Sequence, residues 1–498
     1  MSPIQPKNTE RATMRLRVER NNVTWAKINI SDDYGKSWIS YPLKYNAIEK
    51  NGNFEDWAIM IPKQADPYYY YFSIGNDGEE TTQYYGIYGM TTDKITSYSD
   101  CFFVRPDSDV PEWSYGKYWY GINTNAFYNA DPMNDPSGQY IDMALGQQMN
   151  SNHYRAMFGG DLQGVLEKLD YIKSLGVEGV YLNPLMPSWD AAGYGWLETY
   201  SIASRNGNEE ALANLCKAIH DSDMRIMLDN VVALWPANSV WANDPNYNIY
   251  PFEGSLASKT SRYFDMFFYN MWPGDYLKRF ESIAPDYSGT NAKKAIYSEK
   301  GSLIPRYNSN PFNVDAIRYD SSVYIWGSDT PSEQIVKEMQ TAAKNANPNH
   351  LFIGENDKFR YYDWDTTWNL HYADAQRDIF TFKSTFSQYK RNAIKYMQSI
   401  NRASALSTYN YIDMIDRDRM RTTVKTQWLL NAGTIIQMTY LGSPALRFGN
   451  ETASESTMSH RLNAFNWDES TWNYENYNMV KALGQLRNEY DCLKTGVI

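Results

Sequence analysis

The segment VDAIRYD, residues 314–320, decides the fold of this chain, because it reads as a buried strand that ends in an acid. Apolar residues fill most of it, as in strands of a parallel sheet that is covered on both faces. Arg318 and Asp320 are two residues apart, so their side chains point to the same face of the strand. If Asp320 ends the strand, the Arg318 guanidinium keeps its carboxylate ionised and oriented, as a nucleophile requires.

Two further segments repeat this pattern of an apolar strand followed by an acid. LFIGEN, residues 351–356, contains Glu355, whose pKa burial would raise, so that it could act as a general acid and base. A third segment runs through Asp413 to Asp416, with Arg419 close behind. Acids at strand ends are also common as loop or cap residues. Three of them on three different strands favour a catalytic site at the carboxyl end of a barrel.

The pattern of apolar residues changes near residue 110. Residues 1–110 alternate apolar and polar positions between Asn, Asp and Gly turns, which predicts an antiparallel β-sandwich. From residue 111 strands alternate with helices, which predicts an α/β fold, a (β/α)₈ barrel over 111–488. The expected barrel elements are helices at 162–175, capped by Asp161, and 208–220, and strands at 118–122, 179–182, 225–232, 314–319, 351–354, 404–412 and 445–448.

Composition and charge exclude several classes of protein. The 498 residues carry 47 Lys and Arg against 58 Asp and Glu, a net charge of −11, which argues against nucleic-acid or anionic-membrane surfaces. No apolar run approaches the ~20 residues of a membrane span. Three cysteines and five histidines are too few for a disulfide framework and make a His-based metal enzyme improbable. The N-terminus lacks the pattern of a signal peptide, and both a secreted and a cytoplasmic protein stay open.

The motifs together resemble the α-amylase superfamily, glycoside hydrolase family 13, and are closest to its neopullulanase, cyclomaltodextrinase and maltodextrin-glucosidase branch. The resemblance is carried by FGGDLQG at 158–164, IMLD at 226–229 and the three acid segments, and it runs from about residue 60 to the end. It implies a retaining α-glycosidase that hydrolyses α-glucans or α-gluco-oligosaccharides by double displacement. It also implies an N-terminal domain of the carbohydrate-binding type, through which members of this branch often form homodimers.

The resemblance assigns a role to each residue of the acid segments. Asp320 would be the nucleophile, Glu355 the general acid and base, and Asp416 the carboxylate that stabilises the transition state. Arg318 would brace the nucleophile and bind the donor sugar. Retention of configuration then requires the carboxyl groups of Asp320 and Glu355 to lie ~5–5.5 Å apart.

The chain departs from the family in the donor subsite, which binds the sugar that is transferred. Tyr194 and Arg461 keep the family's residues. Groups that the family uses to bind sugar hydroxyls are replaced at five positions, which are here Gly195, Ala233, Leu234, Ile415 and Thr457. Each sugar hydroxyl left without a partner costs about 1–3 kcal/mol. An altered donor subsite, for another sugar or another linkage, is therefore expected.

Aromatic side chains in the loops after the barrel strands are candidates for sugar binding. Tyr194, Trp196 and Trp235, together with Trp189, occupy such loops. Aromatic rings stack on sugar faces, but ordinary loop packing uses the same residues. With Arg318 and Arg461, the first three are the expected substrate-binding residues.

A metal site is a further expectation. The stretch NADPMND, residues 129–135, supplies four side-chain oxygen ligands within seven residues, which suits a hard cation but also a proline-bounded turn. The resemblance adds a carbonyl and a carboxylate from residues 159–161 and implies Ca²⁺ in a structural role. The six expected ligands are Asn129, Asp131, Asn134, Asp135, Gly159 and Asp161.

Other interpretations stay open at this point. A transglycosylase or isomerase could use the same acids, because water and an acceptor sugar compete for one intermediate. A degenerate carbohydrate-binding protein would explain the altered donor subsite but not the three retained acids. The family normally adds a C-terminal β-sandwich, and residues 489–498 fall where it would begin, so a truncated or a naturally lost domain are both expected readings.

Overall fold

The computed structural model describes residues 1, 6, 9–48, 52–64, 66–78, 82–106, 110–136, 157–245, 250–269, 282–356, 365–400, 402–457 and 463–496. The chain forms two compact units. Residues 1–110 with 386–405 make up the first, and residues 111–385 with 406–498 make up the second. In the described part of the chain, no helix has the length and apolar character that crossing a membrane requires.

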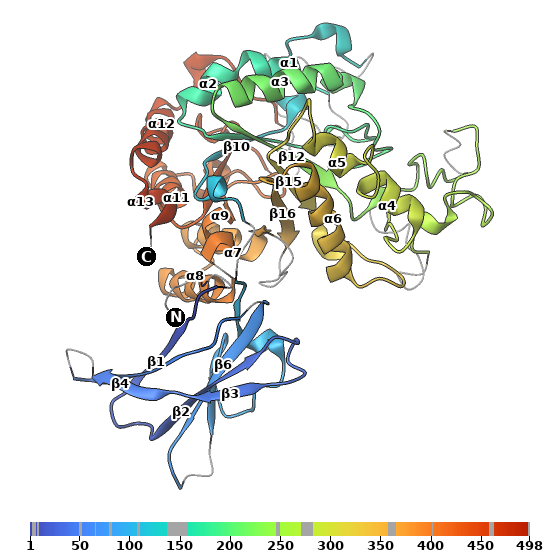
Figure 1. Cartoon of the computed structure of the whole chain (residues 1–498). Coiled ribbons are helices and arrows are strands. Elements are labelled where there is room, and N and C mark those ends of the chain that lie inside the picture. The colour runs from blue at the N-terminus through green and yellow to red at the C-terminus, as the bar shows by residue number, and fades with distance from the viewer. Residues whose placement is uncertain are drawn as a thin grey trace. The chain divides into compact units, whose positions relative to one another are not determined.

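The first unit contains an antiparallel β-sandwich, as the sequence predicts (Figure 1). One sheet has the order β1-β5-β4; the other has the order β3-β2-β6-β7-β8, with β9 on β6. The alternation of β1 buries Met14, Leu16 and Val18 against Ile28 and Phe72 of the facing sheet. Its elements are β1 Thr13–Glu19, β2 Trp25–Ser31, β3 Ile39–Pro42, β4 Lys44–Ile48, β5 Phe54–Met60, β6 Tyr68–Gly75, β7 Gln83–Gly86, β8 Gly89–Thr91, β9 Phe102–Val104 and the helix α8 Phe386–Ser399.

The second unit is built on a parallel sheet of eight strands in the order β17-β16-β15-β12-β11-β10-β19-β18. The end strands β17 and β18 lie next to each other, with Thr366 Oγ1 3.4 Å from Thr408 Oγ1, so the sheet curves into a barrel. The strands are β10 Trp119–Ile122, β11 Gly179–Leu182, β12 Arg225–Val231, β15 Ala316–Asp320, β16 Leu351–Asn356, β17 Thr366–Asn369, β18 Tyr409–Asn410 and β19 Ser443–Arg447. A separate two-stranded sheet pairs β13 Trp235–Pro236 with β14 Ser282–Ile283.

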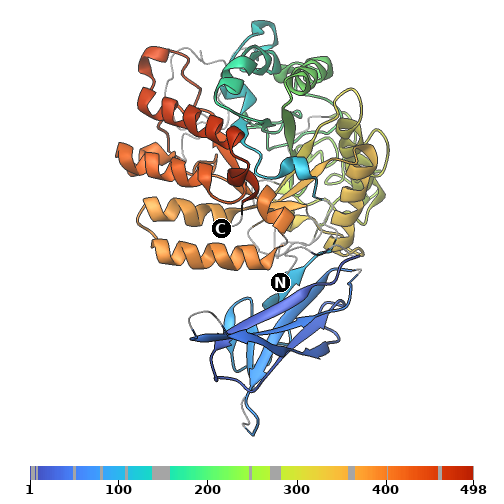
Figure 2. The same ribbon diagram turned by 60° about the vertical axis from the view of Figure 1, so that its left-hand side comes forward.

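Helices surround the strands of the second unit, as both views show (Figures 1 and 2). α3 illustrates why they form, because Asn208 caps its first turn and its apolar residues recur at helical spacing on the buried side. The helices are α1 Leu162–Glu167, α2 Leu169–Ser174, α3 Glu209–Asp221, α4 Thr290–Ile296, α5 Leu303–Asn308, α6 Ser332–Ala346, α7 Leu370–Phe380, α10 Met420–Val424, α11 Gln427–Thr439, α12 Tyr474–Glu489 and α13 Cys492–Thr495. α9 Arg402–Ser407 spans the boundary between the units.

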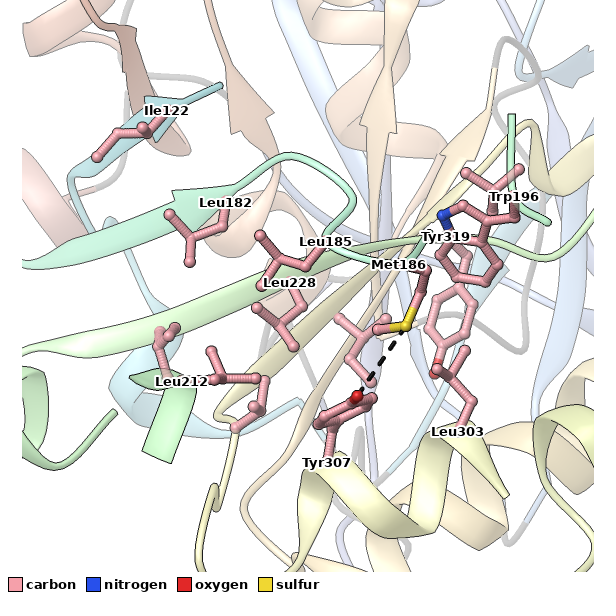
Figure 3. Packing of buried hydrophobic residues seen from close by; sticks show 14 of the residues in the cluster. Ile122, Leu182, Leu185, Met186, Trp196, Leu212, Leu228, Leu303, Tyr307 and Tyr319 are labelled. Atoms are coloured by element: carbon pink, nitrogen blue, oxygen red, sulfur yellow. Dashed lines mark hydrogen bonds between the residues drawn. The ribbon is translucent and has the colours of Figure 1, made fainter. Parts of the chain in front are cut away.

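The main core lies between the barrel strands and these helices. Leu182 of β11 and Leu228 of β12 point into this layer near Leu212 of α3 (Figure 3). Further along, the Tyr307 hydroxyl of α5 contacts the Met186 sulfur at 4.0 Å (Figure 3). This packing fixes the strands, and therefore fixes the side chains at their carboxyl ends.

Two sequence expectations need correction. The helix expected over 162–175 is two helices, because Lys168 between α1 and α2 leaves the helical conformation. The strand expected over 404–412 begins in the helix α9, whose Ala and Ser residues lack the β-branched character of a strand, and only β18, residues 409–410, is a strand. In the region 489–498, the described residues form the end of α12 and the short helix α13, whose Lys494 Nζ bonds Glu178 of the barrel at 2.8 Å.

Candidate active site

Four charged side chains meet at the carboxyl ends of three neighbouring strands. Asp229 of β12 is the direct ladder partner of Arg318 of β15, and Asp320 follows two residues later on the same face. Glu355 stands near the end of β16, just after the last residue that pairs with β15. The two acids expected to do the chemistry are therefore brought to one place by adjacent strands.

A single guanidinium joins these acids. Arg318 Nη1 lies 2.7 Å from Asp320 Oδ1 and 2.8 Å from Asp229 Oδ1, and Arg318 Nη2 lies 2.8 Å from Glu355 Oε2. Arg318 is 3 % exposed. One buried cation thus faces three carboxyl groups, which holds them close but cannot neutralise all three.

Asp229 supports the site from behind. Its Oδ2 accepts hydrogen bonds from the hydroxyls of Tyr181 and, at 2.8 Å, Tyr194. Asn183 Nδ2 donates to the Tyr194 hydroxyl at 2.6 Å and extends this network. Burial raises the pKa of Asp229 to about 6, against the opposing charge of Arg318. The Tyr194 hydroxyl, expected to bind substrate, is engaged in orienting Asp229.

The environment of Glu355 favours the protonated form of its carboxyl group. Burial raises its pKa to about 8; Arg318 opposes this effect and the negative charge of Asp320 adds to it. The backbone N–H of Ser321 donates to Glu355 Oε2 at 2.7 Å. When the environments of two neighbouring carboxyl groups differ in this way, one can stay protonated and act as a proton donor at neutral pH while the other is ionised.

Asp416 lies in the loop that follows β18. Burial raises its pKa, and the nearby charge of Asp320 raises it further, which places the two acids within electrostatic reach. The expected neighbour Arg419 turns away to the Asn450 side chain and the Phe448 carbonyl. Arg417 is adjacent instead, and its guanidinium pairs with Asp374 of α7 at 2.6 Å.

The expected aromatic and basic substrate ligands differ in how exposed the structure leaves them. Trp196 and Trp235 are both 0 % exposed, and Trp235 stacks on Trp241, so these two indoles are core residues without a free face for a sugar. Trp189 is 40 % exposed and lies in the same loop as Tyr194. Arg461 lies outside the described residues.

The loop that carries Trp189 and Tyr194 is built around the carboxylate of Asp190. Asp190 organises it by accepting backbone hydrogen bonds from Gly193 at 2.8 Å, from Tyr194 at 3.3 Å and from Gly195. A Cβ on Gly195 would lie 2.1 Å from Trp189 Nε1 and 2.7 Å from Asp190 Oδ2. A side chain at this position therefore requires the Trp189 ring or the Asp190 carboxylate to move.

We expect Gly195→Ala to lower the free energy of unfolding by about 1–3 kcal/mol, because the new methyl group must displace the Trp189 ring or the Asp190 carboxylate. Thermal unfolding, with tryptophan fluorescence as a second signal, measures the change. Gly301→Ala is the matched control, since no heavy atom lies within 4 Å of a Cβ built there. Equal stability of both variants would show that the loop accommodates a side chain.

The expected metal ligands come together at a different place in the second unit. Asp161, fully buried, caps α1 through Gly164 N at 2.6 Å and also accepts from the backbone of Asp131 at 2.8 Å. Asn129 Nδ2 donates to both oxygens of Asp135. Asn134 and Gly159 belong to the same two segments. Within the described part of the chain, no three His, Cys, Asp or Glu side chains are arranged to hold a metal ion.

Sequence reasoning missed three polar residues that shape the site. Asn183 directly follows the apolar strand β11, and Tyr181 precedes it by two residues on the same face, which is a readable signal. Ser322, whose hydroxyl donates to the Glu355 carbonyl at 2.5 Å, gives no such signal, because its partner lies on another strand.

A parallel barrel with acids gathered at the carboxyl ends of its strands places the protein in the class of barrel enzymes. Comparison with known proteins gives the family. Residues 121–471 match the alpha-amylase family described as "Alpha amylase, catalytic domain". The chain belongs to this family, glycoside hydrolase family 13, in its cyclomaltodextrinase, neopullulanase and maltogenic amylase branch, and it is a glycoside hydrolase.

Individual relatives cover nearly the whole chain. A cyclomaltodextrinase of Geobacillus thermopakistaniensis is 25 % identical over 98 % of this chain and 83 % of its own length. Neopullulanase 2 of Thermoactinomyces vulgaris is 23 % identical over 97 % of this chain and 82 % of its own. A solved cyclomaltodextrinase structure superposes with a TM-score of 0.69 at 19 % identity, over 99 % of this chain and 85 % of that one, which confirms the fold.

Proposed function

We propose that this protein is a retaining α-glycosidase that acts on α-glucans or α-gluco-oligosaccharides. The observation that carries the proposal is the Arg318 guanidinium, which holds Asp320 and Glu355 at 2.7 and 2.8 Å. Two carboxyl groups on one guanidinium suit the separation of ~5–5.5 Å at which a carboxylate attacks the sugar directly. Relatives named cyclomaltodextrinase and neopullulanase support the substrate class.

The reaction proceeds in two displacements. In the first, an oxygen of Asp320 attacks the anomeric carbon, the glycosidic bond breaks, and the proton of Glu355 passes to the leaving oxygen. In the second, Glu355, now ionised, takes a proton from water, whose oxygen displaces Asp320 from the sugar. Asp416, close to Asp320, stabilises the positive charge that develops on the sugar ring.

The donor subsite differs from that of the family. Ala233 is fully buried and Leu234 partly buried just beyond β12, and Ile415 packs against the apolar core. These side chains cannot hydrogen-bond sugar hydroxyls. The preferred substrate therefore presents fewer hydroxyl groups to this side of the site, or presents them in the geometry of another linkage.

Release of sugar products tests the proposal. The substrates are α-1,4, α-1,6 and α-1,3 glucosides, cyclic maltodextrins, sucrose and trehalose, and NMR of the first product reports its anomeric configuration. Products of retained configuration support the proposal, and the preferred linkage describes the donor subsite. Inverted products contradict double displacement. Transfer to a second sugar identifies a transglycosylase, and binding without turnover identifies a carbohydrate-binding protein.

We also propose that Ca²⁺ binds between the segments 129–135 and 159–161 in a structural role. The donor set consists of carboxylate, amide and carbonyl oxygens, which suits Ca²⁺. Burial raises the pKa of Asp161 and the neighbouring charge of Asp131 raises it further, so a cation would relieve repulsion there. Since Asn129 Nδ2 donates to Asp135, binding requires the Asn129 amide to turn so that its oxygen faces the cation.

Calcium is expected to raise the melting temperature. At a concentration of 100 times Kd, a ligand that binds only the folded state adds about 2.7 kcal/mol to the free energy of unfolding. Calorimetry after chelation, and then with added Ca²⁺ or Mg²⁺, measures the effect, and Asp135→Ala should abolish it. A melting temperature that is indifferent to chelation and to Ca²⁺ would contradict the site.

A further inference from the structure

The hydrogen-bonded ladder between β15 and β16 stops just short of the acid/base residue. Its last pair joins Tyr319 to Gly354. Glu355 and Asn356 continue β16 only on the other side, where they pair with β17. On the side of β15, the main chain of Glu355 therefore lies beyond the ladder, where its carbonyl oxygen takes its hydrogen-bond donor from outside the ladder.

Two serines that follow Asp320 make hydrogen bonds to Glu355 beyond the end of the ladder. Ser321 has the left-handed conformation, with φ at +49° and ψ at +36°, which residues other than glycine rarely adopt. This conformation turns its backbone N–H towards Glu355 Oε2 at 2.7 Å. Ser322, 1 % exposed, then donates its hydroxyl to the Glu355 carbonyl oxygen at 2.5 Å. One serine thus holds the carboxyl group of Glu355, and the other holds its main chain.

The donors also select which oxygen carries the proton. Arg318 Nη2 and Ser321 N both contact Oε2, at 2.8 and 2.7 Å. An oxygen that accepts two N–H groups is the carbonyl oxygen of a neutral carboxyl group, since these donors disfavour a proton on it. The proton of Glu355 therefore resides on Oε1, the oxygen that these two donors do not contact.

We propose that Ser322 is a positioning residue for the acid step: its hydroxyl extends the β15–β16 ladder by one side-chain hydrogen bond and so aims Oε1 of Glu355 at the leaving oxygen. This inference rests on the proposed function. Without the hydroxyl, the Glu355 carbonyl loses its bond to the β15 side of the barrel. The carboxyl group then samples orientations in which Oε1 misses the glycosidic oxygen, and proton transfer slows.

The test compares Ser322→Ala with the wild type on two substrates. The leaving group of maltotriose is a sugar oxygen, which needs a proton. The leaving group of α-glucosyl fluoride is fluoride, which departs with little help from an acid. For maltotriose we expect kcat/KM to fall roughly tenfold, part of the roughly 10²–10⁴-fold that a general acid supplies. For α-glucosyl fluoride we expect less than a twofold change (by the same reasoning, since little acid catalysis is at stake). Ser322→Thr, which keeps the hydroxyl, should recover activity on maltotriose.

Ser443→Ala is the matched control. Ser443 is also buried, and its hydroxyl donates to the Ser114 carbonyl at 3.1 Å, but at the amino end of β19, on the opposite edge of the barrel. It should lose similar thermal stability and show no difference between the substrates. An equal fall on both substrates in Ser322→Ala, or no fall, would overturn the positioning role. A wild type that cleaves neither of these substrates nor any glucoside of the panel above would instead refute the proposed function, and this inference with it.

Discussion

Glu355→Gln is expected to lower kcat/KM on unactivated oligosaccharides by roughly 10²–10⁴-fold, because the amide cannot donate the proton that the leaving oxygen needs. The substitution keeps the shape of the side chain, so the Gln oxygen can still accept from Arg318 and from Ser321 N. Steady-state kinetics with maltotriose and with α-glucosyl fluoride measure the effect, and the loss should be far smaller in the first displacement on the fluoride.

The pH dependence identifies the group responsible. The reactive form of Glu355 is protonated and its pKa is raised to about 8, so kcat/KM of the wild type should fall above about pH 8. This alkaline limb should disappear in Glu355→Gln, whose side chain does not titrate. Glu338→Gln on α6 is the control, since Glu338 pairs with Lys293 and Tyr297 in the helical layer. An alkaline limb that survives in Glu355→Gln would assign it to another group.

Arg318→Met is expected to lower the free energy of unfolding by about 3–5 kcal/mol at pH 7, since it removes the cation from a buried ion network. Asp229, Asp320 and Glu355 would then face one another without it. Denaturant unfolding measures the loss. Arg225→Met is the control at the amino ends of the same two strands: the Arg225 side chain, 36 % exposed, pairs with Asp315 at 2.8 Å. Asp315 keeps His220 Nε2 and Ile226 N as partners, so the loss there should be only about 1 kcal/mol.

The loss in Arg318→Met should shrink as the pH falls. Without the guanidinium, which opposes the effect of burial, the pKa values of Asp229 and Glu355 in the folded state rise further above their unfolded values. Because the unfolded state is the same in both proteins, the loss in the variant grows as the pH rises from the folded pKa of the wild type to the higher folded pKa of the variant. This window opens near pH 6 for Asp229 and extends above about pH 8 for Glu355. A difference from the wild type that is constant across this window would contradict the shared-cation interpretation.

The barrel could be predicted from the sequence because its central strands are apolar runs that end in an acidic residue. VDAIRYD and LFIGEN are buried strands at nearly the expected residues, and Asp320 and Glu355 end up beside each other. The segment TTWN of β17 carried no such run, and it was not predicted. Whether such a segment forms a strand depends on the neighbouring strands of the sheet, and the local sequence pattern carries no information about them.

The details of the site depend on contacts between strands. That Arg318 reaches Asp229 as well as Asp320 follows from the register of β12 against β15, which no spacing within one segment reveals. The burial of Trp196 and Trp235 has the same origin, because an indole in a loop after a strand can face either the substrate or the core. The catalytic roles of Asp320, Glu355 and Asp416 stay predictions until the variants are measured.

The pairing of β10 with both β11 and β19 has a consequence for synthesis. β10 is the first barrel strand to leave the ribosome and β19 is the last, so one edge of β10 stays open until Arg447 has emerged. An open strand edge is a template for pairing with other chains. In a nascent chain that stalls before Ser443, the sheet is therefore not closed. The open edge of β10 is exposed for the longest time, and it is the edge that a chaperone would have to cover.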